Sequence, residues 1–174
     1  KFRHRGTVDQ IRRQVDLFDE NMEKLGAYRW DSTPVFVDWN IGNFSVTNDT
    51  KLFSRWDYDW FRMSSRVLDF YFLSRVCSTV GDRTIFSYLI DPVMEPRFLI
   101  FLKAYHAIYP ITRDEVLFMK EAYRFFILNY VVKYGHFFFH ELYATKLQRE
   151  AFDVYFPNLE KHFNPDPIFK ALDL

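Results

Sequence analysis

The 174-residue sequence has a single cysteine, Cys77, and 5 glycines. One cysteine excludes a disulfide framework and any CxxC motif, so we expect a reducing compartment and predict a cytoplasmic location. The most apolar stretch, RFFILNYVVKYGHFFFH, is interrupted by Asn129, Lys133 and His136 and is too polar to span a bilayer. The opening residues, KFRHRGTVDQ, lack the apolar region of a signal peptide. The sequence therefore predicts no membrane partner.

Neither sign of charge is in excess. Lys and Arg together number 23, as do Asp and Glu, so the formal net charge is zero and the pI is about 7.1. This balance argues against non-specific binding to nucleic acid. Apolar side chains are abundant, at 49% of the residues, and 21% are aromatic, which excludes a disordered chain. The length indicates a single domain over residues 1–174, or one lobe of a larger protein.

Apolar periodicity predicts a mostly helical chain with a short β region. Thr7–Leu25 has apolar residues at steps of three and four, typical of an amphipathic helix, and Gly26 is a plausible end. Three β-prone runs follow between Pro34 and Asp59: PVFVDW, NFSVT and KLFSRWDY. The turn residues TNDT between the last two runs predict a hairpin, and we expect the three runs to form one small sheet.

After about Arg62 the helical pattern returns. Thr112 and Glu115 have the spacing of a capping box, so we expect a helix from there to Tyr134 that Gly135 ends. The tail reads as a loop at NPDP followed by a short apolar end. The fold class predicted is α+β, with further helices over Ser65–Val76, Thr84–Leu89, Phe98–Tyr109 and Phe138–Phe156.

The stretch VDWNIGNFSV, residues 37–46, reads as a loop between two strands, because its centre is too polar for a buried strand. It contains Asp38 and, five residues later, Asn43. The following hairpin ends near Asp57 and Asp59, and a hairpin returns its end near its beginning, so we expect these residues to meet. Asn and Asp oxygens suit Mg²⁺ that takes its other ligands from water and phosphate. A separate carboxylate can then accept the proton of a hydroxyl nucleophile.

The ordered stretches FVDWNIGN, RWDYD and RVLDF resemble the motifs of the aminoglycoside phosphotransferase and choline kinase-like superfamily of small-molecule kinases. The resemblance is to the C-terminal lobe of that protein-kinase-like fold, which is mostly helical with a small β-hairpin element carrying the catalytic and metal-binding loops. It implies transfer of the γ-phosphoryl group of ATP to a hydroxyl of a small molecule, with Mg²⁺. It places Asp38 on the catalytic base and Asn43 and Asp57 on metal ligands. Supporting positions fall on Asn40, Asp59, Arg66 and Asp69, the last two as a structural pair beneath the catalytic loop.

Two departures from the family pattern matter. Phe36 stands where the family has a histidine that braces the loop. The sequence also contains no Gly-rich phosphate loop and no strand lysine ahead of the first helix. The resemblance therefore implies a nucleotide-binding N-terminal lobe as a missing partner, and an isolated chain that is inactive. The alternative is a non-catalytic kinase-like module that binds a ligand or a partner.

His136 and His140 are four residues apart, with Glu141 adjacent, which is a spacing that could hold a metal on a helix. Because no third ligand is recognisable, we expect both to flank an aromatic face instead. Cys77 lies in an apolar helical pattern and is expected to be buried.

Overall fold

The structure is a computed structural model, and it describes residues 5–79 and 88–174. The α+β class predicted from the sequence is confirmed. The helices are α1 (Arg5–Lys24), α2 (Val67–Cys77), α3 (Pro96–Ile108), α4 (Arg113–Phe126), α5 (Gly135–Phe138), α6 (Glu141–Glu150), α7 (Phe156–His162) and α8 (Asp166–Leu172). The strands are β1 (Thr33–Val35), β2 (Phe44–Val46), β3 (Leu52–Arg55) and β4 (Arg62–Ser64).

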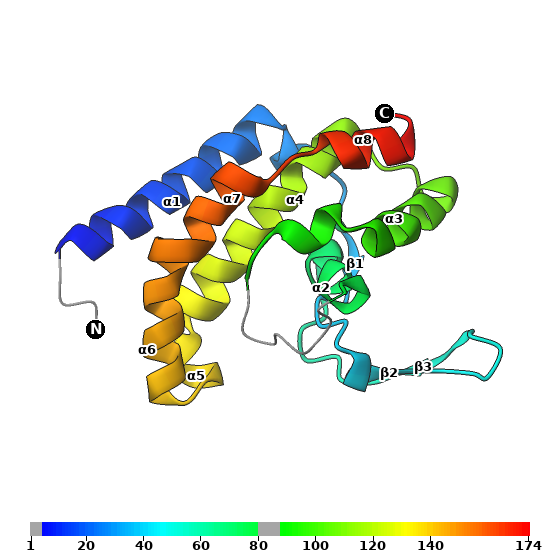
Figure 1. Cartoon of the computed structure of the whole chain (residues 1–174), viewed down its shortest axis with the longest axis horizontal. Helices are drawn as coiled ribbons and strands as arrows, with labels where there is room; N and C mark the ends of the chain where they lie inside the picture. The colour runs from blue at the N-terminus through cyan, green and yellow to red at the C-terminus, as the bar shows by residue number, and fades with distance from the viewer. Residues whose placement is uncertain (1–4, 80–87) are drawn as a thin grey trace.

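The β region forms two antiparallel pairs instead of the single sheet we expected. The predicted hairpin is present as β2 and β3, with Phe44 opposite Arg55, and it projects away from the helices (Figure 1). The first predicted strand pairs with β4, which the sequence pattern did not predict. Val35 of β1 is fully buried, so its backbone amide and carbonyl need hydrogen-bond partners within the protein. Residues Arg62–Ser64 supply them as a strand, where the sequence pattern had indicated the start of a helical region.

Three of the predicted helices are present as α1, α2 and α3, with ends within a few residues of those expected. Gly26 ends α1 as predicted, in the left-handed conformation with φ 63°. The helix predicted over Thr84–Leu89 lies outside the described residues up to residue 87, and Leu89 is not helical.

The long helix predicted from Thr112 begins as expected. The Thr112 hydroxyl accepts from the Glu115 amide, and the Glu115 carboxylate accepts from the Thr112 amide, which completes the capping box. Its continuation is wrong beyond Phe126, because Ile127–Lys133 is a π-helix. Val131 and Val132 of this π-helix are both buried, and Gly135 begins α5 instead of ending the run.

The helix predicted over Phe138–Phe156 is interrupted and then extended. Extended backbone at Phe139 separates α5 from α6, and a π-helix over Ala151–Tyr155 leads into α7. The predicted apolar tail is a helix, α8, whose Pro167 lies in its first turn, where a proline costs no hydrogen bond. Ile168 and Leu172 are buried, so the tail belongs to the core.

Aromatic rings fill much of the hydrophobic core. Tyr71 stacks on Phe126 with ring centroids 4.1 Å apart, and both rings are almost fully buried. Helix α1 packs against α4 (Figure 1). A buried polar cluster joins the two helices. Arg124 is fully buried and donates to Glu121 at 2.7 Å, and Glu121 also accepts from Asn21 of α1 at 2.9 Å. Buried charges of this kind are tolerated because they are paired.

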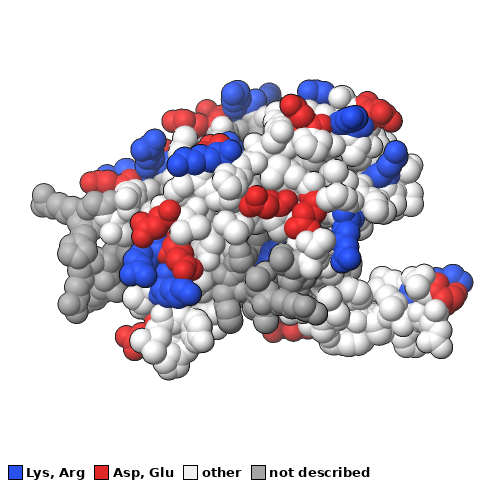
Figure 2. All heavy atoms as spheres, in the orientation of Figure 1, with Lys and Arg blue, Asp and Glu red and all other residues white. Residues whose placement is uncertain are grey.

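Lys and Arg side chains alternate with Asp and Glu across the face drawn in Figure 2, in keeping with the balanced composition. Within the described ranges, no helix has the length and apolar content that crossing a membrane requires.

Candidate functional site

The loop between β1 and β2 is held in an unusual backbone conformation. Val37 has φ 65°, a left-handed value that is strained for a β-branched residue. Its amide donates to Oδ1 of Asp69 in α2 at 2.7 Å, and its side chain is only 2% exposed. Strain of this kind persists only where the surroundings enforce it, and it is concentrated at functional sites.

Asp38 and Asn43 are hydrogen-bonded to each other across this loop. The Asn43 Nδ2 group donates to Oδ2 of Asp38 at 3.0 Å and to the Asp38 carbonyl at 3.4 Å. The Asn40 amide donates to Oδ1 of Asp38 at 3.3 Å, and the Asn40 side chain accepts from Gly42, so it caps a 3-10 helix over Ile41–Asn43. With its Nδ2 engaged, Asn43 keeps an Oδ1 that receives no hydrogen bond from the described part of the chain.

The hairpin brings Asp57 to the same place. The Trp56 amide donates to the Asn43 carbonyl at 3.0 Å, and the Trp56 indole donates to the Gly42 carbonyl, also at 3.0 Å. Asp57 follows directly, with φ 62°, an exposed side chain, and no hydrogen bond or ion pair to the described residues. The end of the hairpin, directly before Asp57, is therefore hydrogen-bonded to the loop at Gly42 and Asn43.

Asp59 is not drawn into this group. Its side chain is exposed, and it makes no hydrogen bond or ion pair within residues 5–79 and 88–174. Over the same ranges, the structure contains no group of three His, Cys, Asp or Glu side chains that could hold a metal ion. A metal at this site would rest on the Asn43 amide oxygen and the Asp57 carboxylate, a sparse set that suits Mg²⁺ bound together with phosphate oxygens.

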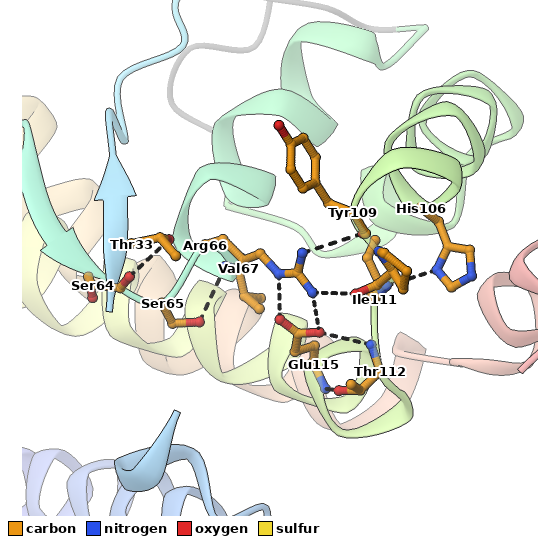
Figure 3. A network of polar contacts seen from close by, with 11 residues as sticks. Thr33, Ser64, Ser65, Arg66, Val67, His106, Tyr109, Ile111, Thr112 and Glu115 are labelled. Atoms are coloured by element: carbon orange, nitrogen blue, oxygen red, sulfur yellow. Dashed lines mark hydrogen bonds and ion pairs between the residues drawn. The ribbon is translucent and has the colours of Figure 1, made fainter. Parts of the chain in front are cut away.

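Arg66 and Asp69 do not pair with each other, which differs from the implied structural pair. Arg66 makes a two-point ion pair with Glu115, through Nε at 2.6 Å and Nη2 at 2.8 Å (Figure 3). It also donates to the carbonyls of Tyr109 and Pro110, so it fixes the start of α4. Of these two residues, only Asp69 is hydrogen-bonded to the loop. Burial raises the pKa of the Asp69 carboxyl, although the Val37 amide works in the opposite direction.

Phe36 packs against an aromatic group around Arg55. The Arg55 guanidinium carbon lies 4.3 Å from the Phe36 ring centroid and 4.7 Å from that of Trp39. Arg55 Nη2 donates to the Asp38 carbonyl at 2.8 Å. Its Nε and Nη1 are buried without a hydrogen-bond partner among the described residues. Sequence reasoning missed Arg55, and the only signal for it was its position two residues before Asp57.

A pocket of about 210 Å³ opens beside this loop. Asp38 and Asn40 line one side of it, and rings from α2, α5 and the π-helix line much of the rest. This pocket was not predicted from the sequence, because its lining residues come from segments far apart in the chain.

The remaining residues singled out in the sequence are the pair His136 and His140, and Cys77. His136 lies in α5 and His140 precedes α6, so the break at Phe139 removes the helical spacing a shared metal would need. Both imidazoles are exposed. Cys77 is half-buried, and burial raises the pKa of its thiol.

No family model, no curated protein and no solved structure matches this chain.

Proposed function

We propose that the protein is an ATP-dependent phosphotransferase that moves the γ-phosphoryl group to a hydroxyl of a small molecule, as in the aminoglycoside phosphotransferase and choline kinase-like superfamily. One observation carries the proposal. The carboxylate of Asp38 accepts a hydrogen bond from the side-chain amide of Asn43 on a strained loop. Asp57 directly follows Trp56, whose amide donates to the Asn43 carbonyl. These are the residue types, in the order along the chain, that such a transfer needs.

The proposed roles follow from the contacts. Asp38, oriented by Asn43 and Asn40, accepts the proton of the acceptor hydroxyl. The free Oδ1 of Asn43 and the carboxylate of Asp57 would hold Mg²⁺, which neutralises charge on the phosphates when bound. Asp69 holds the Val37 amide and Arg55 holds the Asp38 carbonyl, so the chemistry depends on positioning more than on covalent steps.

The proposal includes a nucleotide-covering lobe and a cytoplasmic setting that supplies ATP. Within this sequence there is no Gly-rich loop to cradle phosphates. The hairpin exposes apolar side chains, with Val46 57%, Leu52 60% and Phe53 75% exposed. An apolar patch of this kind next to a proposed nucleotide site is suited to contact with such a lobe.

The test is phosphoryl transfer from radiolabelled Mg-ATP to a panel of small-molecule alcohols by the full-length protein. Asp38→Asn keeps the shape of the side chain and removes the base, so turnover should fall by on the order of a hundredfold or more. Asp49→Asn, at the far end of the same hairpin and also exposed, is the matched control and should retain turnover. Equal turnover in wild type and Asp38→Asn would remove Asp38 from this role.

The alternative is a non-catalytic module that binds a ligand beside the same loop. The observation in its favour is the sparse metal set, since the described residues contain no cluster of three acidic or imidazole ligands. This alternative predicts ligand binding with no transfer to any acceptor, and with no dependence on Mg²⁺.

A further inference from the structure

The pocket beside Asp38 has a lining that narrows the choice of acceptor. Eight of its twelve lining residues are aromatic, and Asp38 is the only carboxylate among these twelve. Its volume of about 210 Å³ is small. Because a cavity of about 150 Å³ holds benzene, this pocket suits a body of roughly ten non-hydrogen atoms.

Three rings form a mutually packed wall of this pocket. Trp60 lies 4.7 Å from Tyr130 and 5.4 Å from Phe138, between ring centroids, and Tyr130 lies 5.6 Å from Phe138. They come from the segment after the hairpin, from the π-helix and from α5. The Tyr130 hydroxyl accepts from Arg62 at 3.4 Å, which fixes the central ring. A wall of rings held in this way favours a flat apolar body over a flexible polar one.

The Arg75 side chain already lies against three other rings of the pocket lining. The Arg75 guanidinium carbon lies 5.4 Å from the Tyr71 ring centroid, 5.7 Å from that of Phe72 and 5.6 Å from that of Tyr88. All four residues line the pocket. A positively charged ligand would therefore meet like charge where these rings would otherwise attract it. A polycationic acceptor would also find only one carboxylate.

We infer that the acceptor is a small neutral alcohol with an aromatic or similarly flat apolar body, bound with its hydroxyl toward Asp38. The inference rests on the proposed phosphotransferase function and names the substrate class for that site. In the transfer, the hydroxyl proton passes to the Asp38 carboxylate and the alcohol oxygen bonds to the γ-phosphorus. The bond from that phosphorus to the β–γ bridging oxygen breaks, and ADP leaves with the electron pair.

Binding without nucleotide tests the ligand class directly. The probes are phenethyl alcohol, choline and the aminoglycoside kanamycin, each titrated into the full-length protein and followed by saturation-transfer NMR. Phenethyl alcohol should bind with a Kd of roughly millimolar or tighter, and choline and kanamycin at least about tenfold more weakly. Choline or kanamycin binding as tightly as phenethyl alcohol would overturn the inference, as would no detectable binding of the alcohol.

Two neighbouring phenylalanines provide a matched pair of variants. Phe138 contacts Trp60 and Tyr130 in the pocket, whereas Phe137 is 82% exposed and does not line it. Phe138→Ser should weaken phenethyl alcohol binding about fivefold or more through lost apolar contact, and Phe138→Leu should retain most of it. Phe137→Ser should leave the affinity unchanged. An equal affinity in Phe138→Ser and Phe137→Ser would place the ligand elsewhere and overturn the inference.

A transfer assay separates failure of the inference from failure of the function. Aryl alcohols that bind in a Phe138-dependent way, but are never phosphorylated, would overturn the proposed function and leave the ligand class supported. ATP-dependent phosphorylation of choline or kanamycin, with no transfer to aryl alcohols, would support the function and overturn the inferred substrate class.

Discussion

Arg55 braces the backbone of Asp38 from the hairpin, at 2.8 Å from Nη2 to the carbonyl oxygen, while its guanidinium lies over the ring of Phe36. The two contacts link the strand that leads to Asp57 with the loop that holds Asp38. Phe36 has no polar group with which to brace this loop. We therefore assign the bracing role to Arg55, with Phe36 as the surface on which its side chain rests.

Arg55→Ala should lower the free energy of unfolding by about 2 kcal/mol, because it removes a charged hydrogen bond and a cation–π contact. In the transfer assay kcat should fall about tenfold with a smaller change in KM, since the base loses its position more than the substrate loses contacts. Arg55→Lys should recover only part of kcat, because an ammonium does not stack as a planar guanidinium does.

Lys51→Ala is the control for Arg55, since it removes an exposed positive charge from the same hairpin. Denaturant unfolding and steady-state kinetics of the three variants decide the matter. If Arg55→Ala matches Lys51→Ala in both kcat and stability, Arg55 is not a positioning residue.

Asp69→Ala should destabilise the protein by about 1–3 kcal/mol, because it leaves the amide of the strained, buried Val37 without its acceptor. Asp69→Asn keeps an acceptor oxygen and should cost less. The exposed Asp153→Asn is the control and should stay within about 0.5 kcal/mol of wild type in urea unfolding.

The pH dependence gives Asp69 a second test. Burial raises the pKa of its carboxyl above the ordinary value of 3.8, so the folded protein binds this proton more tightly than the unfolded chain does. The contribution of Asp69 to stability must then decrease as the pH rises from 3.8 through the raised value. Asp69→Asn removes this decrease, and the difference in unfolding free energy between variant and wild type should change across that interval. A difference that is constant with pH would contradict the assigned shift.

Glu115 should show the opposite dependence. Burial acts to raise its pKa, but the hydrogen bonds from Arg66 and the Thr112 amide outweigh burial and hold the pKa below the ordinary value of 4.5. Its stabilising effect is therefore fully present above pH 4.5 and is lost as the pH falls through the lowered value. Glu115→Gln should flatten this acid loss and cost about 2–3 kcal/mol at neutral pH by leaving Arg66 without its partner.

Asp114→Asn is the control for Glu115, because Asp114 is the preceding residue of α4 and is exposed. Chemical denaturation of both variants from neutral to acid pH supplies the comparison. An acid profile that is unchanged in Glu115→Gln would show that the Arg66 pair does not carry the acid sensitivity.

The sequence predicted what depends on local pattern and missed what depends on packing. The hairpin was predictable because TNDT is a turn signal between two β-prone runs, and the start of α4 was predictable from Thr112 and Glu115. The π-helix over Ile127–Lys133 could not be predicted, since its apolar residues fit an α-helical reading equally well. Which apolar residues become buried is decided by neighbouring helices.

The candidate site divides in the same way. The approach of the hairpin end, beside Asp57, to the loop with Asp38 and Asn43 was predictable, because a hairpin returns near its start. The partner of Arg66 was not legible, because Glu115 lies 49 residues away and Asp69 was the nearer carboxylate. Likewise, Phe36 and Arg55 are separated by a whole hairpin, so their contact is visible only in three dimensions.

Nucleotide affinity of the 174-residue chain supplies the last prediction. Asn43 and Asp57 offer few oxygen ligands, and Mg²⁺ gives up its water reluctantly, so these residues alone should hold Mg-ATP weakly. The Asp57 side chain is exposed, and the hairpin leaves Leu52 and Phe53 open to solvent, with no Gly-rich loop in the sequence to close over phosphates. The expected Kd is millimolar or weaker, which corresponds to about −4 kcal/mol or less favourable binding.

Isothermal titration of Mg-ATP into this chain measures that affinity, with Asp57→Asn as the variant and Asp49→Asn as the charge-matched control on the same hairpin. Asp49 lies at the opposite end of the two strands. Heat that is lost in Asp57→Asn and kept in Asp49→Asn would therefore come from Mg-ATP bound beside Asp57. Micromolar binding would mean that the chain closes its own nucleotide pocket, and the expected covering lobe would then be unnecessary. Weak binding that strengthens when a covering lobe is supplied would instead place the nucleotide between that lobe and the exposed side of the hairpin.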